Sequence, residues 1–462
     1  MKIIINAILL SVIYSQGSVA APFNATGKIY SPLQFDRTSS FAGDLEASHI
    51  APSDSAPDVE PDVAMEVTPE WSQDFKSQFS IIRVKIFPHN SAYNAPLGKD
   101  ADTSKLTVFS RGDCKVYRSE STTSENGIVR DHILRSGKLF EFNVQSLTEP
   151  VWVECAAAIT LKRPDYPTNP VSYSGLLFIK KVNAAVPYLT VVNVLPFEQY
   201  LKGVVPSEMP ASWSLEVLKA QAVAARTYAY FELGTNVAKN DKNLLIEKSG
   251  AQIDDTVSYQ AYLGLKNTTT ATDTAVDETS GMVMTHENRI IKAYFHADSG
   301  GHTENSENVW GDARPYIIGK PEIYPEGSVP GSSWSYTTKI SALEEKLMAA
   351  GLLSEGEELQ SLQIDFNDLY PSTRPKFVEL KLADGSTKKI TAVSYAFATG
   401  IKSPWIKFSE STTEAQSVVV SGKGFGHGAG MNQWGAKVMI DKLQKKYDDV
   451  LKFYYTDIKI TN

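Results

Sequence analysis

A glutamate between two prolines is the residue of this sequence best placed for chemistry. Glu208 has Pro206 two residues before it and Pro210 two residues after it. Because proline fixes φ and has no N–H, we expect the backbone here to leave regular structure and to direct the Glu208 side chain. Three apolar residues follow closely: Met209, Trp213 and Leu215. Their shielding would favour a protonated carboxyl, so the pattern indicates a catalytic acid or, alternatively, an acid that serves a helix macrodipole.

A second cluster of polar residues begins where an apolar run ends near residue 295. His296 and His302 lie close to Asp298, Glu304 and Glu307. Imidazole and carboxylate groups are suitable zinc ligands, but the spacing matches no strong metal signature. Hydrogen bonding to a substrate and a purely structural polar turn are the other interpretations of this segment.

A glycine-rich stretch occupies residues 422–436. Gly424, Gly426 and Ala429 fit a dinucleotide-binding pattern, but the chain ends too soon afterwards to complete the βαβ unit that this pattern requires. Three residues of the stretch instead offer hydrogen bonds and a stacking face for a sugar: His427, Gln433 and Trp434. A structural glycine-rich corner is the alternative.

The elements that must position these residues can be predicted from the pattern around them. An alanine-rich helix is expected over residues 215–233, with Ser214 as N-cap and Gly234 as its end. Arg226 is the basic residue in the second half of this helix, and it either extends to solvent or reaches the Glu208 site. Before the helix, β-rich runs separated by turn residues are expected at 81–87, 106–109, 139–144, 151–155, 176–182 and 188–195.

Length and composition indicate an exported protein with several cores. The chain has 462 residues, of which 42% are hydrophobic, enough for two or three cores. Residues 1–20 have the pattern of a secretory signal peptide, and no later apolar run is long enough to span a bilayer. Residues 21–75 read as an acidic linker rich in Pro, Ala and Ser, with ten acidic and two basic residues. The rest is almost neutral, which disfavours nucleic acid as a partner.

The two cysteines, Cys114 and Cys155, both lie in strand-like surroundings. An even count in an exported chain permits a disulfide. Its loop of about 40 residues would contribute roughly 3–4 kcal/mol in the chain-entropy model.

Three segments together resemble one family. Residues 195–210 with 218–229, residues 295–305 with 309–311, and residues 426–436 are similar, in this order, to the signatures of the SpoIID/LytB family of cell-wall proteins. The resemblance runs from about residue 80 to the end. It implies an α+β fold in which a β-rich N-terminal part, residues 76–175, packs on a mixed SpoIID-like catalytic core, residues 176–462.

The resemblance also implies an activity. Members are lytic transglycosylases that cleave the β-1,4 bond between N-acetylmuramic acid and N-acetylglucosamine in peptidoglycan strands, typically strands without stem peptides. Glu208 matches the catalytic glutamate, which acts first as acid and then as base and leaves a 1,6-anhydro end, so that no second carboxylate is needed. The candidates for the substrate groove are Arg226, His296, Ser299, His302, His427, Gln433 and Trp434.

Two departures and two alternatives accompany this assignment. Some relatives bind zinc with cysteines near the loop matching residues 296–308, which here has none, so we expect no cofactor. Residues 324–376 match nothing in the family and read as a peripheral insertion that adjusts substrate choice. Because some proteins with this domain modify wall amidases, a binding partner of an amidase without turnover is the main alternative. A hydrolase with a metal held by His296 and His302 is the other.

Overall fold

The computed structural model describes residues 73–88, 103–119, 128–134, 136–162, 170–184, 186–238, 249–256, 259–325, 327–410 and 416–462. The expected signal peptide and nearly all of the expected linker lie outside these residues. The last linker residues, 73–75, already belong to helix α2 (Gln73–Gln78). Within the described ranges, no helix has both the length and the hydropathy needed to cross a lipid bilayer.

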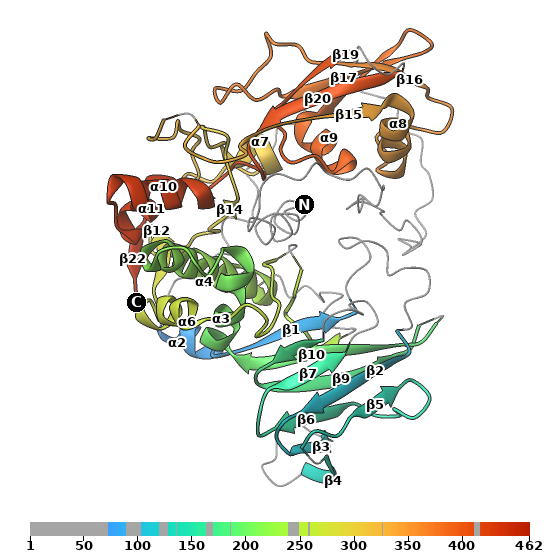
Figure 1. Ribbon diagram of the computed structural model, residues 1–462, viewed down its shortest axis with the longest axis vertical. Helices are drawn as coiled ribbons and strands as arrows, with labels where there is room; N and C mark the ends of the chain where they lie inside the picture. The colour runs from blue at the N-terminus through green and yellow to red at the C-terminus, as the bar shows by residue number, and fades with distance from the viewer. Residues whose placement is uncertain are drawn as a thin grey trace.

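Strands dominate the N-terminal part, at the bottom of Figure 1. They are β1 (Ile81–Phe87), β2 (Lys105–Ser110), β3 (Cys114–Ser119), β4 (Ile128–Leu134), β5 (Phe140–Asn143), β6 (Val151–Cys155), β7 (Ile159–Lys162), β8 (Val171–Tyr173), β9 (Leu176–Val182), β10 (Tyr188–Pro196) and β11 (Ile253–Asp254). One sheet has the order β11-β1-β10-β9-β6-β3-β4, and a second has the order β5-β2-β7-β8. All six β-rich runs predicted from the sequence form strands.

Strands β9 and β10 join the two regions that the sequence separates at residue 175. Both lie in the same sheet as β1 and β6, with Ile81 opposite Pro196 and Val151 opposite Ile179. Residues from the strands and from the following helices also share one hydrophobic core. The division at residue 175 therefore falls within one packed unit. Because β10 leads directly into the next helix, the sheet fixes where that helix starts.

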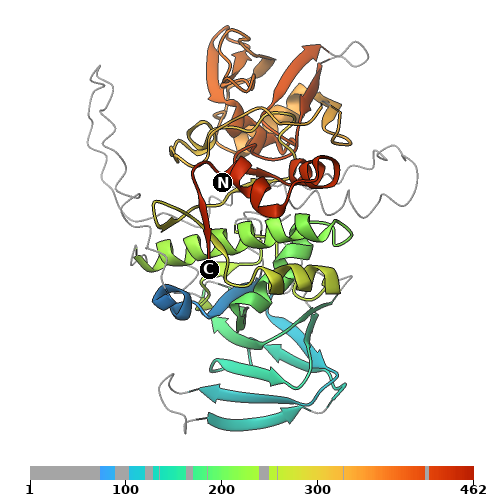
Figure 2. The same cartoon turned by 90° about the vertical axis from the view of Figure 1, so that its left-hand side faces the viewer.

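The helices of this unit lie between the sheet and the top of Figures 1 and 2. They are α3 (Phe197–Glu208), α4 (Leu215–Ala238), α6 (Thr270–Glu278), α10 (Gln433–Leu443) and α11 (Tyr447–Tyr454). Helix α3 packs on the sheet, α4 and α6 pack on α3, and α10 and α11 pack on α4. Helix α4 begins where the sequence predicts but continues through Gly234 to Ala238. Gly234 is buried, so packing outweighs the cost of about 1 kcal/mol of a glycine in a helix.

Short elements complete this unit. They are β12 (Val283–His286), β13 (Arg289–Ile290), β14 (Phe295–His296), α7 (Ser306–Trp310), β21 (Met431–Asn432) and β22 (Lys459–Thr461). Strands β14 and β21 pair in parallel, with Phe295 opposite Met431 and His296 opposite Asn432. This pairing brings the histidine-containing segment and the glycine-rich segment side by side.

A second domain with its own hydrophobic core lies at the top of Figure 1. Its elements are β15 (Ser333–Lys339), α8 (Ile340–Ala349), β16 (Leu359–Gln363), β17 (Phe377–Leu382), β18 (Thr387–Thr391), α9 (Ala392–Thr399), β19 (Ile406–Glu410) and β20 (Ser417–Lys423). They form two sheets, β15-β20-β19 and β16-β17-β18. The segment that matched nothing in the family belongs largely to this domain. The α+β class is confirmed, and the region from residue 176 contains two hydrophobic cores.

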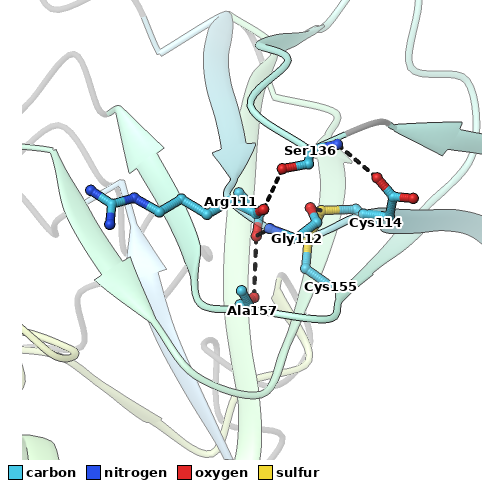
Figure 3. Close-up of a disulfide and its surroundings, with 8 residues drawn as sticks. Arg111, Gly112, Cys114, Ser136, Cys155 and Ala157 are labelled. Carbon is cyan, nitrogen blue, oxygen red and sulfur yellow. Dashed lines mark hydrogen bonds between the residues drawn. A yellow bond between two sulfur atoms is a disulfide. The ribbon is translucent and has the colours of Figure 1, made fainter.

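The disulfide permitted by the sequence is present. Cys114 and Cys155 lie directly opposite each other on β3 and β6 and are bonded, which closes a loop with a sequence separation of 41. Figure 3 shows the bond beside the turn at Arg111 and Gly112, whose Arg111 carbonyl accepts a hydrogen bond from the Ser136 hydroxyl. The bond thus fastens the end of the seven-stranded sheet farthest from the helices.

Candidate active site

Glu208 is the last residue of helix α3, and this differs from the sequence prediction. Pro206 lies inside the helix rather than ending it. The expectation that both prolines keep Glu208 out of regular structure is therefore wrong for the N-terminal side. It holds on the other side, because Met209 is extended (φ −130°, ψ 150°), as a residue before proline prefers, and Pro210 follows the helix.

The Glu208 carboxyl is fixed by a backbone donor. The side chain is 95% buried, and its Oε1 accepts a hydrogen bond of 2.7 Å from the Ala261 N–H. The neighbouring Ser207 hydroxyl accepts one of 3.3 Å from the Leu263 N–H. These two bonds attach the end of α3 to the segment after β11. A catalytic carboxyl needs this kind of orientation by its surroundings.

The Glu208 backbone is held by a residue near the C-terminus. Gln433 donates a hydrogen bond of 3.3 Å to the Glu208 carbonyl oxygen and another of 3.3 Å to Gln221 Oε1 on α4. Both glutamine side chains are buried. The Gln221 Nε2 and Gln433 Oε1 atoms have no partner among the described residues. Gln433, predicted to bind substrate, is thus placed as a support of Glu208.

Two tryptophans lie next to this support. Trp434, which follows Gln433, contacts Trp213 edge to face with ring centroids 4.9 Å apart. Trp434 is partly exposed, and its backbone N–H donates to the Ala297 carbonyl (3.0 Å). The structure therefore brings Glu208, Gln433 and Trp434 together, and Trp434 keeps exposed surface on which a sugar could stack.

Arg226 is fully buried and forms a bidentate ion pair with Glu198, at 2.9 and 2.7 Å. Its other donors bond to α6 and the turn after it, at Val276, Thr279 and Met282. Because Arg226 offers no exposed surface, the structure does not bring it into a groove. It instead connects α4 to α6 and to α3, the helix that ends in Glu208.

His296 and His427 bond to the two peptide groups that flank the Ala429 Cα. His296 Nδ1 donates to the Ala429 carbonyl (3.1 Å), and His427 Nδ1 accepts from the Ala429 N–H (3.1 Å). His427 Nε2 therefore carries a hydrogen, which it donates to the Phe295 carbonyl (2.9 Å). Burial lowers the pKa of His296 well below its usual 6.5, and His427 and Arg374 add to the effect. His296 is neutral at physiological pH, and both histidines support the loops.

Ser299 and His302 have different surroundings. Ser299 is buried and belongs to a network in which its hydroxyl and the Asn432 amide both donate to Glu322 Oε1, at 2.8 and 3.0 Å. Burial raises the pKa of Glu322. His302 is partly exposed and its Nδ1 donates to the Thr303 carbonyl (2.6 Å). None of the described contacts joins His302 to Glu208.

The side chains considered for a metal do not converge. Across the described ranges, no group of three or more His, Cys, Asp or Glu residues is arranged to hold a metal ion. His296 and His302 each direct Nδ1 to a backbone carbonyl. A cavity of about 540 Å³ lies between Asp298, residues 324–325 and 327–333, Trp405 and Lys423, and Glu208 does not line it.

Sequence reasoning missed several residues that complete the site. Ala261 acts through its backbone, and Gln221 is one of many polar residues on α4, so neither carries a signal in a single sequence. Tyr200 is fully buried, and burial raises its pKa, with the charges of Glu208, Asp254 and Asp255 adding to the effect. Two further acids thus lie near enough to act on the same tyrosine as Glu208. Only their adjacency in sequence could have suggested them.

Known proteins resemble this chain over much of its length. The family model described as "Stage II sporulation protein" matches residues 187–286, which include α3, Glu208 and α4. An uncharacterized protein of Brachyspira hyodysenteriae is 33% identical over 64% of this chain and 73% of its own length. An amidase enhancer of Bacillus subtilis is 31% identical over 57% of this chain and 40% of its own. The stage II sporulation protein D of Bacillus amyloliquefaciens is 30% identical over 58% of this chain and 75% of its own. This chain belongs to the stage II sporulation protein D family.

Proposed function

We propose that this protein is a lytic transglycosylase that cleaves peptidoglycan glycan strands. Its substrate would be the β-1,4 bond between N-acetylmuramic acid and N-acetylglucosamine, in strands without stem peptides. The observation that carries the proposal is the fixing of Glu208: α3 ends at it, Ala261 holds its carboxyl and Gln433 holds its carbonyl. Membership in the family supports a role at the cell wall, and the signal-like residues 1–20 support export.

The proposed reaction uses Glu208 twice. The protonated carboxyl donates its proton to the glycosidic oxygen, and the bond from C1 to that oxygen breaks with its electron pair going to oxygen. The carboxylate then takes the proton of the muramic acid C6 hydroxyl as O6 attacks C1. A 1,6-anhydro end forms and Glu208 is again protonated. Because Oε1 accepts the Ala261 N–H, we assign the transferred proton to Oε2.

Partly exposed aromatic surface at Trp434, the residue after the Glu208 support Gln433, supports a sugar substrate. Trp434 is partly exposed and is braced by Trp213, so its ring is held in one orientation. An aromatic face held in this way is suited to the apolar face of a pyranose. The near-neutral charge of residues 76–462 is compatible with a neutral or weakly acidic glycan and gives no basic surface for nucleic acid.

Mass spectrometry of soluble products tests the proposal. Wild-type protein, Glu208→Gln and the control Glu278→Gln are each incubated with intact and with peptide-free strands. Glu278 suits a control because it is a half-exposed acid of α6 paired with Lys219. Anhydromuramic ends from the wild type and the control alone would support Glu208 as the acid. Reducing ends would mean hydrolysis by water. The absence of products from both substrates would contradict the proposed transglycosylase activity.

The second candidate is an enhancer of a wall amidase without turnover of its own. The 31% identity with the amidase enhancer favours it, although this chain covers only 40% of that protein. A binding partner needs the groove but no proton donor. Glu208→Gln should then enhance a purified wall amidase as well as the wild type does, whereas a transglycosylase loses its activity with this change.

A further inference from the structure

A tight turn of the second domain, residues 370–375, inserts two side chains between the loops 298–305 and 424–430. Thr373 adopts a left-handed conformation (φ 63°), its N–H donates to the Tyr370 carbonyl (2.8 Å), and Tyr370 N–H donates to the Arg374 carbonyl (2.9 Å). This turn directs Ser372 and Arg374 out of their own domain. Both are buried, and Arg374 is only 3% exposed. The expected peripheral insertion is therefore, at this turn, part of the packed interior.

Arg374 contacts the loop that follows His296. Its Nη2 donates to the Ser299 carbonyl (2.6 Å), and its Nη1 lies 3.6 Å from Glu304 Oε2. The Ser372 hydroxyl donates to the same Glu304 oxygen. The guanidinium stacks on the Trp405 ring at 4.8 Å from its centroid. A planar cation with several donors suits this combination, and lysine could not reproduce it.

The glycine-rich loop leaves the space that Arg374 fills. Gly428 has φ +85°, and a Cβ there would lie 2.7 Å from Arg374 Nη2. The Gly428 carbonyl accepts a hydrogen bond from the Glu304 backbone N–H (2.8 Å), and Glu304 and Ala429 form an isolated parallel β-bridge. Three chain segments, 298–305, 370–375 and 424–430, thus meet around one guanidinium.

The charges around Arg374 make it difficult to replace. Asp298, Glu304 and Glu322 all act on it, and burial lowers its pKa to about 10, so that it remains charged at neutral pH. Burial raises the pKa of Asp298 and of Glu322. Without Arg374, these buried carboxylates would lose their shared cation, and the loops that carry them would rearrange or take up protons.

The loops held by Arg374 are the ones that support Glu208. The Ser299 hydroxyl accepts a hydrogen bond from the Asn432 side-chain amide (3.0 Å), and the Ala297 carbonyl accepts one from the Trp434 backbone N–H (3.0 Å). Gln433 lies between Asn432 and Trp434 in the sequence. Gln433 in turn donates to the Glu208 carbonyl. We propose that Arg374 of the second domain is a positioning residue for the active site, which it keeps assembled by holding the 298–305 and 424–430 loops. This inference rests on the proposed function.

The test compares Arg374→Met and Arg374→Lys with Lys376→Met. Lys376 lies two residues away and forms a surface ion pair with Asp368. Lys376→Met therefore removes one positive charge, as Arg374→Met does. We measure kcat and KM for anhydromuramic ends on peptide-free strands, together with thermal unfolding. We expect kcat to fall at least about tenfold in the Arg374 variants with KM changed less than about threefold, and Lys376→Met to resemble the wild type. A wild-type kcat in folded Arg374→Lys would overturn the inference.

Hydrogen exchange supplies a readout that does not depend on activity. Residues 298–305 and 424–434 should exchange faster in Arg374→Lys than in Lys376→Met, whereas exchange in α4 should not change. If the wild type makes no anhydro ends, the proposed function fails and hydrogen exchange alone decides whether Arg374 holds the loops. If Arg374→Met does not fold, the lysine variant carries the test. Unchanged exchange in both loops would overturn the inference in either case.

Discussion

Gln433 and Glu208 are 225 positions apart in the sequence and joined by a hydrogen bond of 3.3 Å from the Gln433 side chain to the Glu208 carbonyl oxygen. The bond connects the start of α10 to the end of α3. It holds the backbone of the proposed acid rather than its carboxyl. Gln433, which the sequence suggests as a substrate-binding residue, thus supports the backbone of the proposed catalytic acid.

Replacing Gln433 with Met should lower turnover without unfolding the protein. Met fills a similar volume but cannot donate to Glu208, so the end of α3 loses one of its supports. We expect kcat to fall about 10- to 100-fold, the size of effect that follows a small misplacement of a catalytic group. Gln221→Met is the matched control, because it removes the Gln433 partner on α4 but leaves the bond to Glu208. Equal kcat in the two variants would argue against a positioning role for Gln433.

Arg226→Met should destabilise the protein strongly. Removing this fully buried cation leaves the Val276 and Met282 carbonyls without their guanidinium donor, and an unsatisfied buried acceptor costs about 1–3 kcal/mol. The partly exposed Glu198 also loses its bidentate partner. Lys202→Met is the control, since Lys202 of α3 pairs with the largely exposed Asp277 of α6 and its loss should cost about 1 kcal/mol or less. Urea unfolding measures both free energies. A loss of activity in Arg226→Met with unchanged stability would instead favour the predicted contact with substrate.

How much the sequence could predict depended on whether the information was local. β-rich runs bounded by turn residues located strands such as β6 and β9, and the alanine-rich pattern located the start of α4. The prolines misled, because Pro206 reads as a helix breaker but lies two residues before the end of a helix already formed. The Ala261 N–H and the Arg374 guanidinium could not be found, since a backbone donor has no sequence signature and the Arg374 partner Ser299 lies 75 positions away.

Removing the disulfide should lower stability without affecting turnover. The Cys114–Cys155 loop has a sequence separation of 41, for which chain entropy predicts about 3–4 kcal/mol. The bond lies between β3 and β6, away from α3 in Figure 1. We expect the double variant Cys114→Ser with Cys155→Ser to unfold at lower denaturant concentration and to keep its kcat at 25 °C. A large fall in kcat of the folded variant would contradict the separation of this sheet from the site.

The stability of the protein should contain a pH-dependent contribution from Asp254. Burial raises the pKa of this carboxyl from 3.8 to about 6, against the opposing hydrogen bonds from Thr256. A group that binds its proton more tightly when folded contributes stability that is fully present below pH 4 and is lost as the pH rises through 6. The loss amounts to about 3 kcal/mol for a shift of this size. Asp254→Asn, which cannot ionise, should therefore gain stability relative to the wild type as the pH rises from 4 to 7.

Asp448 provides a control of opposite sign. A hydrogen bond from Lys452 Nζ (2.9 Å) lowers the pKa of Asp448, so this group contributes stability above its unfolded pKa and loses it as the pH falls. Asp448→Asn should thus lose stability relative to the wild type as the pH rises, by a smaller amount because the pair is exposed and screened. Unfolding free energies measured from about pH 2 to pH 8 give both slopes, that of Asp448 below about pH 5 and that of Asp254 between about pH 4 and 7. If the difference between Asp254→Asn and the wild type stayed constant over this range, Asp254 would already be ionised throughout it, and burial would not control its proton.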